Sequence, residues 1–193
     1  MKISIISQNF QRSVNVWSVG FLQYKTAYQV QKYLANLHFN MSNKEKTDGT
    51  ILMVEHLPGI SFQIIKFVYN LAFVKCSAWC LVYTTGIRTQ GYPESEERRL
   101  KALGAEFYRT NRGGLITFHG PGQLVVYPIL NLKGFKKSMK WYICKLEETV
   151  ISVCKTFGVE AERSSDTGVW VKNNKICAIG ISHLNQNYYL KIL

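Results

Sequence analysis

The sequence is short of acidic residues. Twelve Asp and Glu oppose 24 Lys and Arg, which gives a formal net charge of +12 at pH 7. No acidic residue precedes Glu45, whereas several serines and the basic residues Lys2, Arg12, Lys25, Lys32 and Lys44 do. This bias is typical of a mitochondrial import segment, although an ordinary basic first element has the same composition. The net charge favours polyanionic partners of any kind and does not choose among them.

Paired cysteines, repeats and low-complexity tracts are also lacking. The five cysteines are an odd number at irregular spacings (Cys76, Cys80, Cys144, Cys154 and Cys177), which argues against a secreted disulfide framework and indicates a reducing compartment. A chain of 193 residues with 47% apolar and 19% charged residues fits one globular domain. Disordered, collagen-like and disulfide-stabilised miniprotein classes are excluded.

Uninterrupted apolar runs of membrane-spanning length are scarce. Residues 60–83 are long enough to span a bilayer. Lys66 and Lys75 would then lie in the hydrocarbon, each at a cost of about 2.5–3.5 kcal/mol, and Gln63 and Asn70 add to the penalty. We therefore expect no membrane span.

The order of predicted elements is mixed. Apolar periodicity predicts strands over 14–19, 51–55, 106–109, 115–118 and 123–129, and helices from Tyr24 onward, over 93–103 and over 142–157. A hairpin follows, with strands over 169–171 and 176–179 and a turn of Lys172-Asn173-Asn174-Lys175, in which the asparagines can adopt a left-handed backbone. This order predicts an α+β fold, a mixed sheet covered by helices, rather than a doubly wound parallel sheet.

Residues 112–123 form the segment most typical of a binding site. Glycines surround an Arg, a Thr and a His in Arg-Gly-Gly-Leu-Ile-Thr-Phe-His-Gly-Pro-Gly-Gln, so the backbone can approach a ligand closely and expose its amides. The segment lacks the Gly-Lys-Ser/Thr end of a P-loop and any dinucleotide-type glycine spacing. Composition alone also allows a structural alternative, in which two tight turns flank a strand and His119 is a hydrogen-bonded structural residue.

Extended through Leu-Val-Val-Tyr-Pro to residue 128, this segment resembles the signature of the lipoyl(octanoyl) transferases. Further matches occur in order on both sides: Val54-Glu55-His56-Leu57-Pro58, Val82-Tyr83-Thr84-Thr85-Gly86, Leu103-Gly104-Ala105-Glu106, and Thr167-Gly168-Val169-Trp170-Val171 leading to Lys175-Ile176-Cys177-Ala178-Ile179-Gly180. The resemblance runs from about residue 14 to residue 180 and is strongest to the animal, mitochondrial branch. It implies a mitochondrial enzyme that passes octanoyl from acyl carrier protein to a lysine of lipoyl domains.

The resemblance also implies a fold and a site. The fold would be like that of the biotin and lipoate protein ligases, with no ATP, metal or other cofactor required. The acyl pocket would be walled by Arg112, Gly113, Gly114, Leu115, Ile116, Thr117, Phe118 and His119 and by Ala178, Ile179 and Gly180. A cysteine thiolate would carry the acyl group as a thioester beside a catalytic lysine, which by position is Lys175. A nearby ammonium favours the thiolate, although Lys175 could equally be a solvated hairpin residue.

Partners follow from the same resemblance. The donor would be octanoyl-acyl carrier protein, and the acceptors would be the lipoyl domains of 2-oxoacid dehydrogenase E2 subunits and the glycine cleavage H protein. A nucleic-acid-binding module is disfavoured, because basic and aromatic residues are interleaved only in scattered places such as Phe135-Lys136-Lys137. An ATP-dependent ligase relative would share the fold, but the full signature favours the transferases.

Two departures from the family stand out. Residues 60–81 intervene as an atypical insertion, and after a family-like domain over 14–181 the residues 182–193 form a tail unlike the family's C-terminal strands. The family's nucleophilic cysteine, expected in that missing stretch, is absent, and Cys177 lies on the predicted pocket wall without a catalytic role. The alternative is therefore a catalytically inactive truncated isoform or gene model. Missing strands and an apolar insertion also predict aggregation or poor expression.

Overall fold

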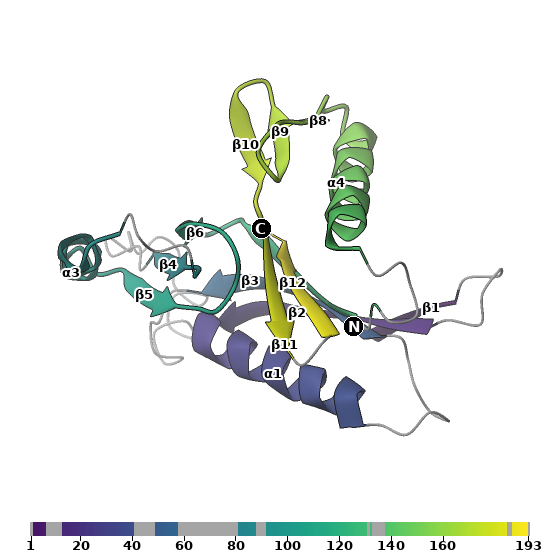
Figure 1. Ribbon diagram of the computed structural model, residues 1–193, viewed down its shortest axis with the longest axis horizontal. Coiled ribbons are helices and arrows are strands. Elements are labelled where there is room, and N and C mark those ends of the chain that lie inside the picture. The colour runs from purple at the N-terminus through teal and green to yellow at the C-terminus, as the bar shows by residue number, and fades with distance from the viewer. Residues whose placement is uncertain are drawn as a thin grey trace, which may run out of the picture.

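The computed structural model describes residues 2–6, 13–40, 49–57, 81–87, 92–130, 132, 138–184 and 187–192. The largest element is a six-stranded sheet with the order β1-β2-β3-β7-β12-β11, made by Lys2–Ile6, Ser13–Gln23, Gly49–Leu57, Leu124–Leu130, Asn187–Ile192 and Ile179–Leu184. Within this sheet, strands β2 and β3 are parallel and the other neighbouring strands are antiparallel. The α+β prediction with a mixed sheet is confirmed (Figure 1).

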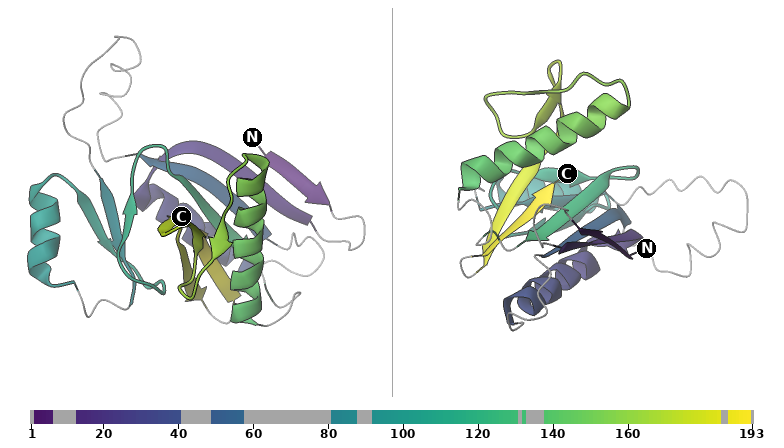
Figure 2. Two further views of the ribbon diagram at one scale, coloured as in Figure 1. Left: turned by 90° about the horizontal axis from the view of Figure 1, so that it is seen from above. Right: turned by 90° about the vertical axis from the view of Figure 1, so that its right-hand side faces the viewer.

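Helices α1 (Tyr24–Asn40) and α4 (Met139–Thr156) cover opposite faces of this sheet (Figure 2). Alternation along β7 explains both contacts, because successive side chains of a strand point to opposite faces. Val125 and Tyr127 pack in one core with Ala27 of α1, whereas Val126 and Leu130 pack in a second core with the α4 residues. β7 is therefore the strand that joins the two cores.

Two smaller sheets flank the large one. The first has the order β5-β4-β6 and consists of Glu106–Arg109, Val82–Thr85 and Thr117–His119. Helix α3 (Glu94–Ala102) packs against β5 and buries Leu100. The second has the order β10-β9-β8, made by Asn174–Cys177, Val169–Val171 and Glu162–Arg163, and lies next to α4 (Figure 1).

The helix boundaries follow the sequence signals. Pro93 is the N-cap of α3, and its first turn carries three acidic residues that suit the positive end of a helix dipole. The helix is followed by Gly104, which has φ 85° as a left-handed stop requires. Ser138 caps α4, because its Oγ accepts a hydrogen bond from the Trp141 backbone N–H at 3.2 Å.

Three features differ from, or lie beyond, the sequence expectations. The turn of the β9–β10 hairpin contains two residues, and its left-handed residue is Lys172 (φ 54°) rather than an asparagine. Residues 187–192, for which no element had been predicted, form β12 inside the large sheet. The insertion lies outside the described residues except for Leu81. Among the described helices, none is long and apolar enough to cross a membrane.

Candidate functional site

A cavity of about 670 Å³ opens where the three sheets and α4 meet. The segment 112–117 forms one wall, and Ala178, Ile179, Gly180 and Ile181 form another. Ile143 of α4, the residues 165–167 and Lys175 complete the lining. All the predicted site residues except Phe118 and His119 are thus brought together around one space, although they come from segments more than 50 positions apart.

Arg112 organises the first wall from within. Its side chain is buried, and Nη2 donates to the Thr84 carbonyl oxygen at 2.7 Å, to the Leu115 carbonyl oxygen at 2.9 Å and to Thr117 Oγ1 at 2.8 Å. These partners tie the loop to the end of β4 and fold it around the guanidinium. Burial lowers the pKa of Arg112 from its ordinary value. Its Nη1 and Nη2 groups donate to the protein's own oxygens, whereas the buried Nε has no hydrogen-bond partner among the described residues.

Two glycines allow the walls to approach each other. A Cβ at Gly86 would collide with the carbonyl oxygens of Arg112 and Gly114, so only glycine fits beneath the loop. A Cβ at Gly180 would lie 3.0 Å from Arg112 Cδ. The Gly113 N–H also donates to the Ile181 carbonyl oxygen at 2.6 Å. The loop and strand β11 are consequently joined through backbone groups.

Lys175 reaches the cavity from the hairpin. It pairs with Trp170 across the β9–β10 ladder, and its Nζ lies 4.7 Å from the centroid of the Trp170 ring. A cation over an indole face is attracted by the ring quadrupole, which favours this rotamer. The side chain also runs against Gly168, because a Cβ there would lie 3.3 Å from Lys175 Cε. The predicted catalytic lysine is therefore held at the cavity wall by its own hairpin.

His119 and Phe118 lie outside the cavity lining. His119 is buried, with Nδ1 3.0 Å from Gln123 Oε1 and Nε2 3.3 Å from Thr84 Oγ1. The same Thr84 hydroxyl accepts from Arg112 at 3.0 Å, so His119 supports the first wall from behind. Phe118 is 43% exposed, and its ring centroid lies 5.4 Å from that of Tyr83.

A buried polar cluster behind that wall had no predicted role. His56 Nε2 lies 2.6 Å from the Tyr127 hydroxyl, and the His56 ring contacts the rings of Tyr24 and His119. Burial raises the pKa of Tyr24 and of Tyr127, so both hydroxyls stay protonated as hydrogen-bond donors. The signal available in the sequence was the position of His56 within one of the family-like motifs.

A second, adjoining cavity of about 390 Å³ was also missed. It shares Ile143, Ser165 and Thr167 with the first cavity, and it is further lined by Met139, Lys140, Cys144, Glu147 and Ser164. Most of these residues lie on α4 or on the loop between β8 and β9. Nothing in their spacing distinguishes them from an ordinary amphipathic helix and loop, so the sequence alone gave no sign of this chamber.

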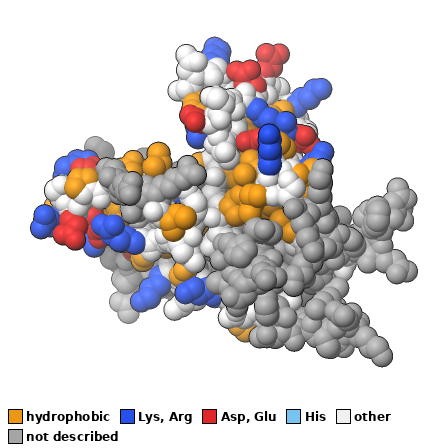
Figure 3. Space-filling model, in the orientation of Figure 1, with side chains coloured by type: hydrophobic (Ala, Val, Ile, Leu, Met, Phe, Trp, Pro, Cys, Tyr) orange, Lys and Arg blue, Asp and Glu red, His pale blue; other side chains and the backbone are white. Residues whose placement is uncertain are grey.

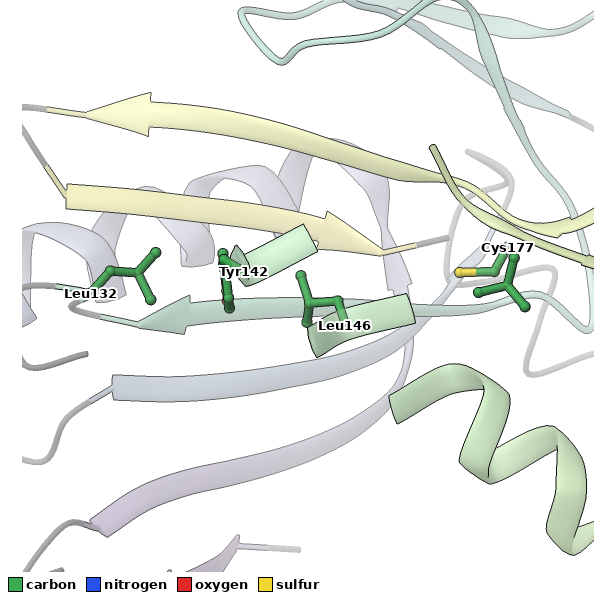
Figure 4. Close-up of a cluster of buried hydrophobic side chains, with 5 residues drawn as sticks. Leu132, Tyr142, Leu146 and Cys177 are labelled. Carbon is green, nitrogen blue, oxygen red and sulfur yellow. The ribbon is translucent and has the colours of Figure 1, made fainter. Parts of the chain in front are cut away.

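Among the described residues, Cys144, Cys154 and Cys177 form no disulfide. Cys177 is buried in the apolar cluster under α4, with Leu132, Tyr142 and Leu146, along one face of the large sheet (Figure 4). Cys144 lines only the second cavity, and Cys154 lies half-buried on α4. No cysteine is therefore among the described residues that line the main cavity.

Comparisons with known proteins place these features in a family. The family model described as the lipoyl protein ligase A/B catalytic domain matches residues 79–192. The mitochondrial octanoyl-[acyl-carrier-protein]:protein N-octanoyltransferase of Danio rerio is 49% identical over 169 residues, which are 88% of this chain and 64% of that protein. The putative mitochondrial lipoyltransferase 2 of Drosophila melanogaster is 57% identical over 87% of this chain and 62% of its own length.

Solved structures show the same fold. The putative lipoate protein ligase from T. acidophilum with bound lipoic acid superposes with a TM-score of 0.60 at 11% identity, over 92% of this chain and 66% of that one. The chain spans less than two thirds of the length of the Danio rerio and Drosophila melanogaster relatives. The matched range 79–192 contains all the segments that line the main cavity. The chain belongs to the lipoyl protein ligase A/B catalytic domain family.

Proposed function

We propose that the chain takes part in protein lipoylation by binding an octanoyl group and transferring it from octanoyl-acyl carrier protein to a lysine of a lipoyl domain. The observation that supports this most directly is the main cavity, which gathers the predicted acyl-binding segments and Lys175. Its volume of about 670 Å³ falls in the range of small-molecule sites. The names of the curated relatives point to the same reaction.

The reaction proceeds in two acyl transfers. The first transfer, as the family resemblance implies it, needs a cysteine thiolate, which no described residue of the main cavity supplies. That thiolate attacks the carbonyl carbon of the donor thioester, a new thioester forms, and the carrier leaves as its thiolate. The acceptor lysine amine then attacks this second thioester, forms the amide, loses a proton and releases the thiolate. The cavity walls hold the acyl chain, while the Lys175 ammonium at the rim favours a thiolate over a thiol and compensates the charge on the carbonyl oxygen.

Donor and acceptor partners belong to the same proposal. We propose octanoyl-acyl carrier protein as the donor, and lipoyl domains of 2-oxoacid dehydrogenase E2 subunits and the glycine cleavage H protein as acceptors. Acyl carrier proteins are acidic, and a net charge of +12 speeds encounter with an acidic partner. A mitochondrial location is supported by the relatives' names. The acid-free first 44 residues add little, because residues 13–40 form β2 and α1 of the folded domain.

A second candidate function is octanoyl binding without transfer. The observation that favours it is the placement of the cysteines, since none of the described residues that line the main cavity carries a thiol and Cys177 lies in the apolar core. Such a chain would bind the donor or the free acyl group and form no thioester.

The test is incubation of the chain with octanoyl-acyl carrier protein and a lipoyl domain, followed by intact-mass spectrometry of both proteins. We expect octanoylation of the lipoyl domain at a rate that falls about 100-fold in Lys175→Ala, as is usual for loss of a group acting on the reacting atoms. Lys172→Ala, in the turn of the same hairpin, is the matched control and should leave the rate unchanged.

The outcomes separate the two functions. A hydroxylamine-sensitive adduct on the chain that is lost in Cys177→Ala would assign the nucleophile to that residue. Binding of octanoyl-acyl carrier protein with neither adduct nor product would support the second function and reject transfer by this chain. Absence of both binding and transfer would contradict both functions.

A further inference from the structure

Glu147 is a buried acid that the proposed reaction does not use. It lies on α4, its side chain is only 8% exposed, and its neighbour Leu146 packs in the core beneath the helix. A buried carboxylate is costly unless hydrogen bonds and opposite charge compensate it. Glu147 has both, because Oε1 accepts from the Gly168 backbone N–H at 2.9 Å and Oε2 lies 3.3 Å from Arg163 Nε.

These two partners are the two ends of one loop. Arg163 is the last residue of β8, and Gly168 immediately precedes β9. The single carboxylate therefore bonds both ends of the loop 164–167. Within this loop, Ser165 and Thr167 line both cavities and Asp166 lines the main one. The anchor therefore fixes one part of the cavity wall, residues 165–167, that contains no regular secondary structure.

The same anchor reaches Lys175 through Gly168. A Cβ at Gly168 would lie 3.3 Å from Lys175 Cε and 3.4 Å from Cδ and would collide with the Cys177 carbonyl oxygen. The Gly168 backbone is thus the surface on which the lysine stem rests. A shift of Gly168 would move Lys175 away from the Trp170 ring and from the cavity.

We propose that Glu147 is a positioning residue, which sets the place of the Lys175 ammonium and of the loop 164–167 by holding Gly168 and Arg163 with one carboxylate. The inference rests on the proposed function of Lys175 for its meaning in the reaction. The anchoring itself can be measured without any acyl transfer.

Variants of Glu147 and Glu148 test the bond to Gly168 separately from the ion pair with Arg163. Glu147→Ala removes both. Glu147→Gln keeps an oxygen that accepts from Gly168 but loses the charge that attracts Arg163. Glu148→Gln is the matched control, because Glu148 is the next residue on α4 and also bonds Arg163, at 2.9 Å to Nη2, but it is exposed and does not contact Gly168.

The first readout is the rate of lysine acetylation by a small amine-reactive ester, measured by peptide mass spectrometry as the ratio of Lys175 to Lys172. Lys172 is exposed in the same hairpin and acts as the internal standard. Both lysines are exposed, so the ratio reports the contact of the Lys175 ammonium with the Trp170 ring rather than burial. We expect the ratio to rise about threefold in Glu147→Ala, by less in Glu147→Gln, and to stay unchanged in Glu148→Gln, because only Glu147 accepts from the Gly168 N–H. Unchanged ratios in both Glu147 variants would overturn the inference.

Hydrogen exchange distinguishes local release from general unfolding. Peptides covering 164–175 should exchange faster in Glu147→Ala, while those covering β3 and β7 should match wild type. Equal acceleration in β3 and β7 would mean that Glu147 only stabilises the fold and would overturn the inference. If Glu147→Ala does not fold, the smaller rise in the acetylation ratio that is expected for Glu147→Gln tests the inference instead.

The second readout is a double-mutant cycle on octanoyl transfer. If Glu147 acts through Lys175, the double variant Glu147→Ala/Lys175→Ala is no slower than Lys175→Ala alone, with the loss in kcat rather than in KM for the lipoyl domain. Additive losses would overturn the inference. Absence of transfer by wild type would reject the proposed function and leave the acetylation ratio to judge the anchoring.

Discussion

At the scale of single residues, burial affects the pKa of His38 more than the helix dipole does. It lies in the last turn of α1, where the negative end of the dipole favours a charged imidazole. Its Nε2 lies 2.9 Å from Oγ1 of the buried Thr50 on β3, and burial lowers the pKa of His38 below its ordinary 6.5. The neutral ring is therefore the form that the fold accommodates.

This pKa predicts a pH dependence of stability. Because the folded pKa lies below that of the unfolded chain, the unfolded state binds more protons as the pH falls, so this stability is fully present above about pH 6.5 and is lost below it. We expect the free energy of unfolding in urea to fall between pH 7 and pH 5 by more in wild type than in His38→Gln, which does not titrate. Identical slopes for the two proteins would contradict this account.

Most residues that line the main cavity had been predicted from the sequence to lie together, because they belong to short, contiguous motifs, whereas their part in acyl binding stays a prediction. Gly113, Gly114 and Gly180 line the main cavity as expected. His119 was expected in the same wall but lies behind it, bonded to Gln123 and Thr84. A motif shows which residues are near a site, but it does not show on which side of the strand each side chain points.

At the scale of elements, α4 carries a testable start signal. Ser138 Oγ accepts from the Trp141 N–H, one of the helix donors with no partner inside the helix. We expect Ser138→Ala to lower the free energy of unfolding by about 1 kcal/mol in urea titrations, and Ser138→Asp to keep most of it. Equal losses in both variants would show that the loss does not come from the capping hydrogen bond.

Strand boundaries were harder to predict than helix boundaries. The apolar run 176–179 was expected to form one strand, but the structure assigns Ile176 and Cys177 to β10 and Ile179 to β11, in different sheets. A register shift between Lys175 and Cys177 accompanies this division. Short apolar runs have the same periodicity in either sheet, so only tertiary pairing decides where one strand ends and the next begins.

At the scale of the whole molecule, the segment Arg112-Gly113 links two sheets. Arg112 bonds Thr84 of the β5-β4-β6 sheet, and its neighbour Gly113 bonds Ile181 of the large sheet. A lysine has the charge but not the planar fork needed for several acceptors at once. We therefore expect Arg112→Lys to lower the free energy of unfolding by about 2–3 kcal/mol, since buried acceptors lose their donor.

Arg109→Lys is the matched control for this prediction. Arg109 bonds Glu97 on the surface, at 2.6 Å, and exposed ion pairs contribute little. Denaturant unfolding of the two variants should show a loss only at position 112. A comparable loss in Arg109→Lys would mean that replacing an arginine by lysine lowers the free energy of unfolding whether or not buried acceptors lose their donor.

Charge is distributed rather than concentrated on the face that Figure 3 shows. At the α3 end, basic and acidic side chains lie side by side, in agreement with the ion pairs of Arg99 with Glu96 and of Lys101 with Glu97. The net charge was known from the sequence, whereas its local pairing depends on helix spacing and on contacts such as Arg109 with Glu97. The pairing of β12 with β7 was equally out of reach, because pairing between distant strands leaves no local pattern.

The glycines of the cavity wall also limit how the site can evolve. Gly114 has φ 96°, which other residues rarely adopt, and Gly180 lies against the Arg112 side chain. Where a wall consists of backbone, a point mutation has few side chains to exchange. An inhibitor that packs against Gly114 and Gly180 would consequently leave few routes to resistance, whereas one that depends on Leu115 or Ile143 would be escaped by a single substitution.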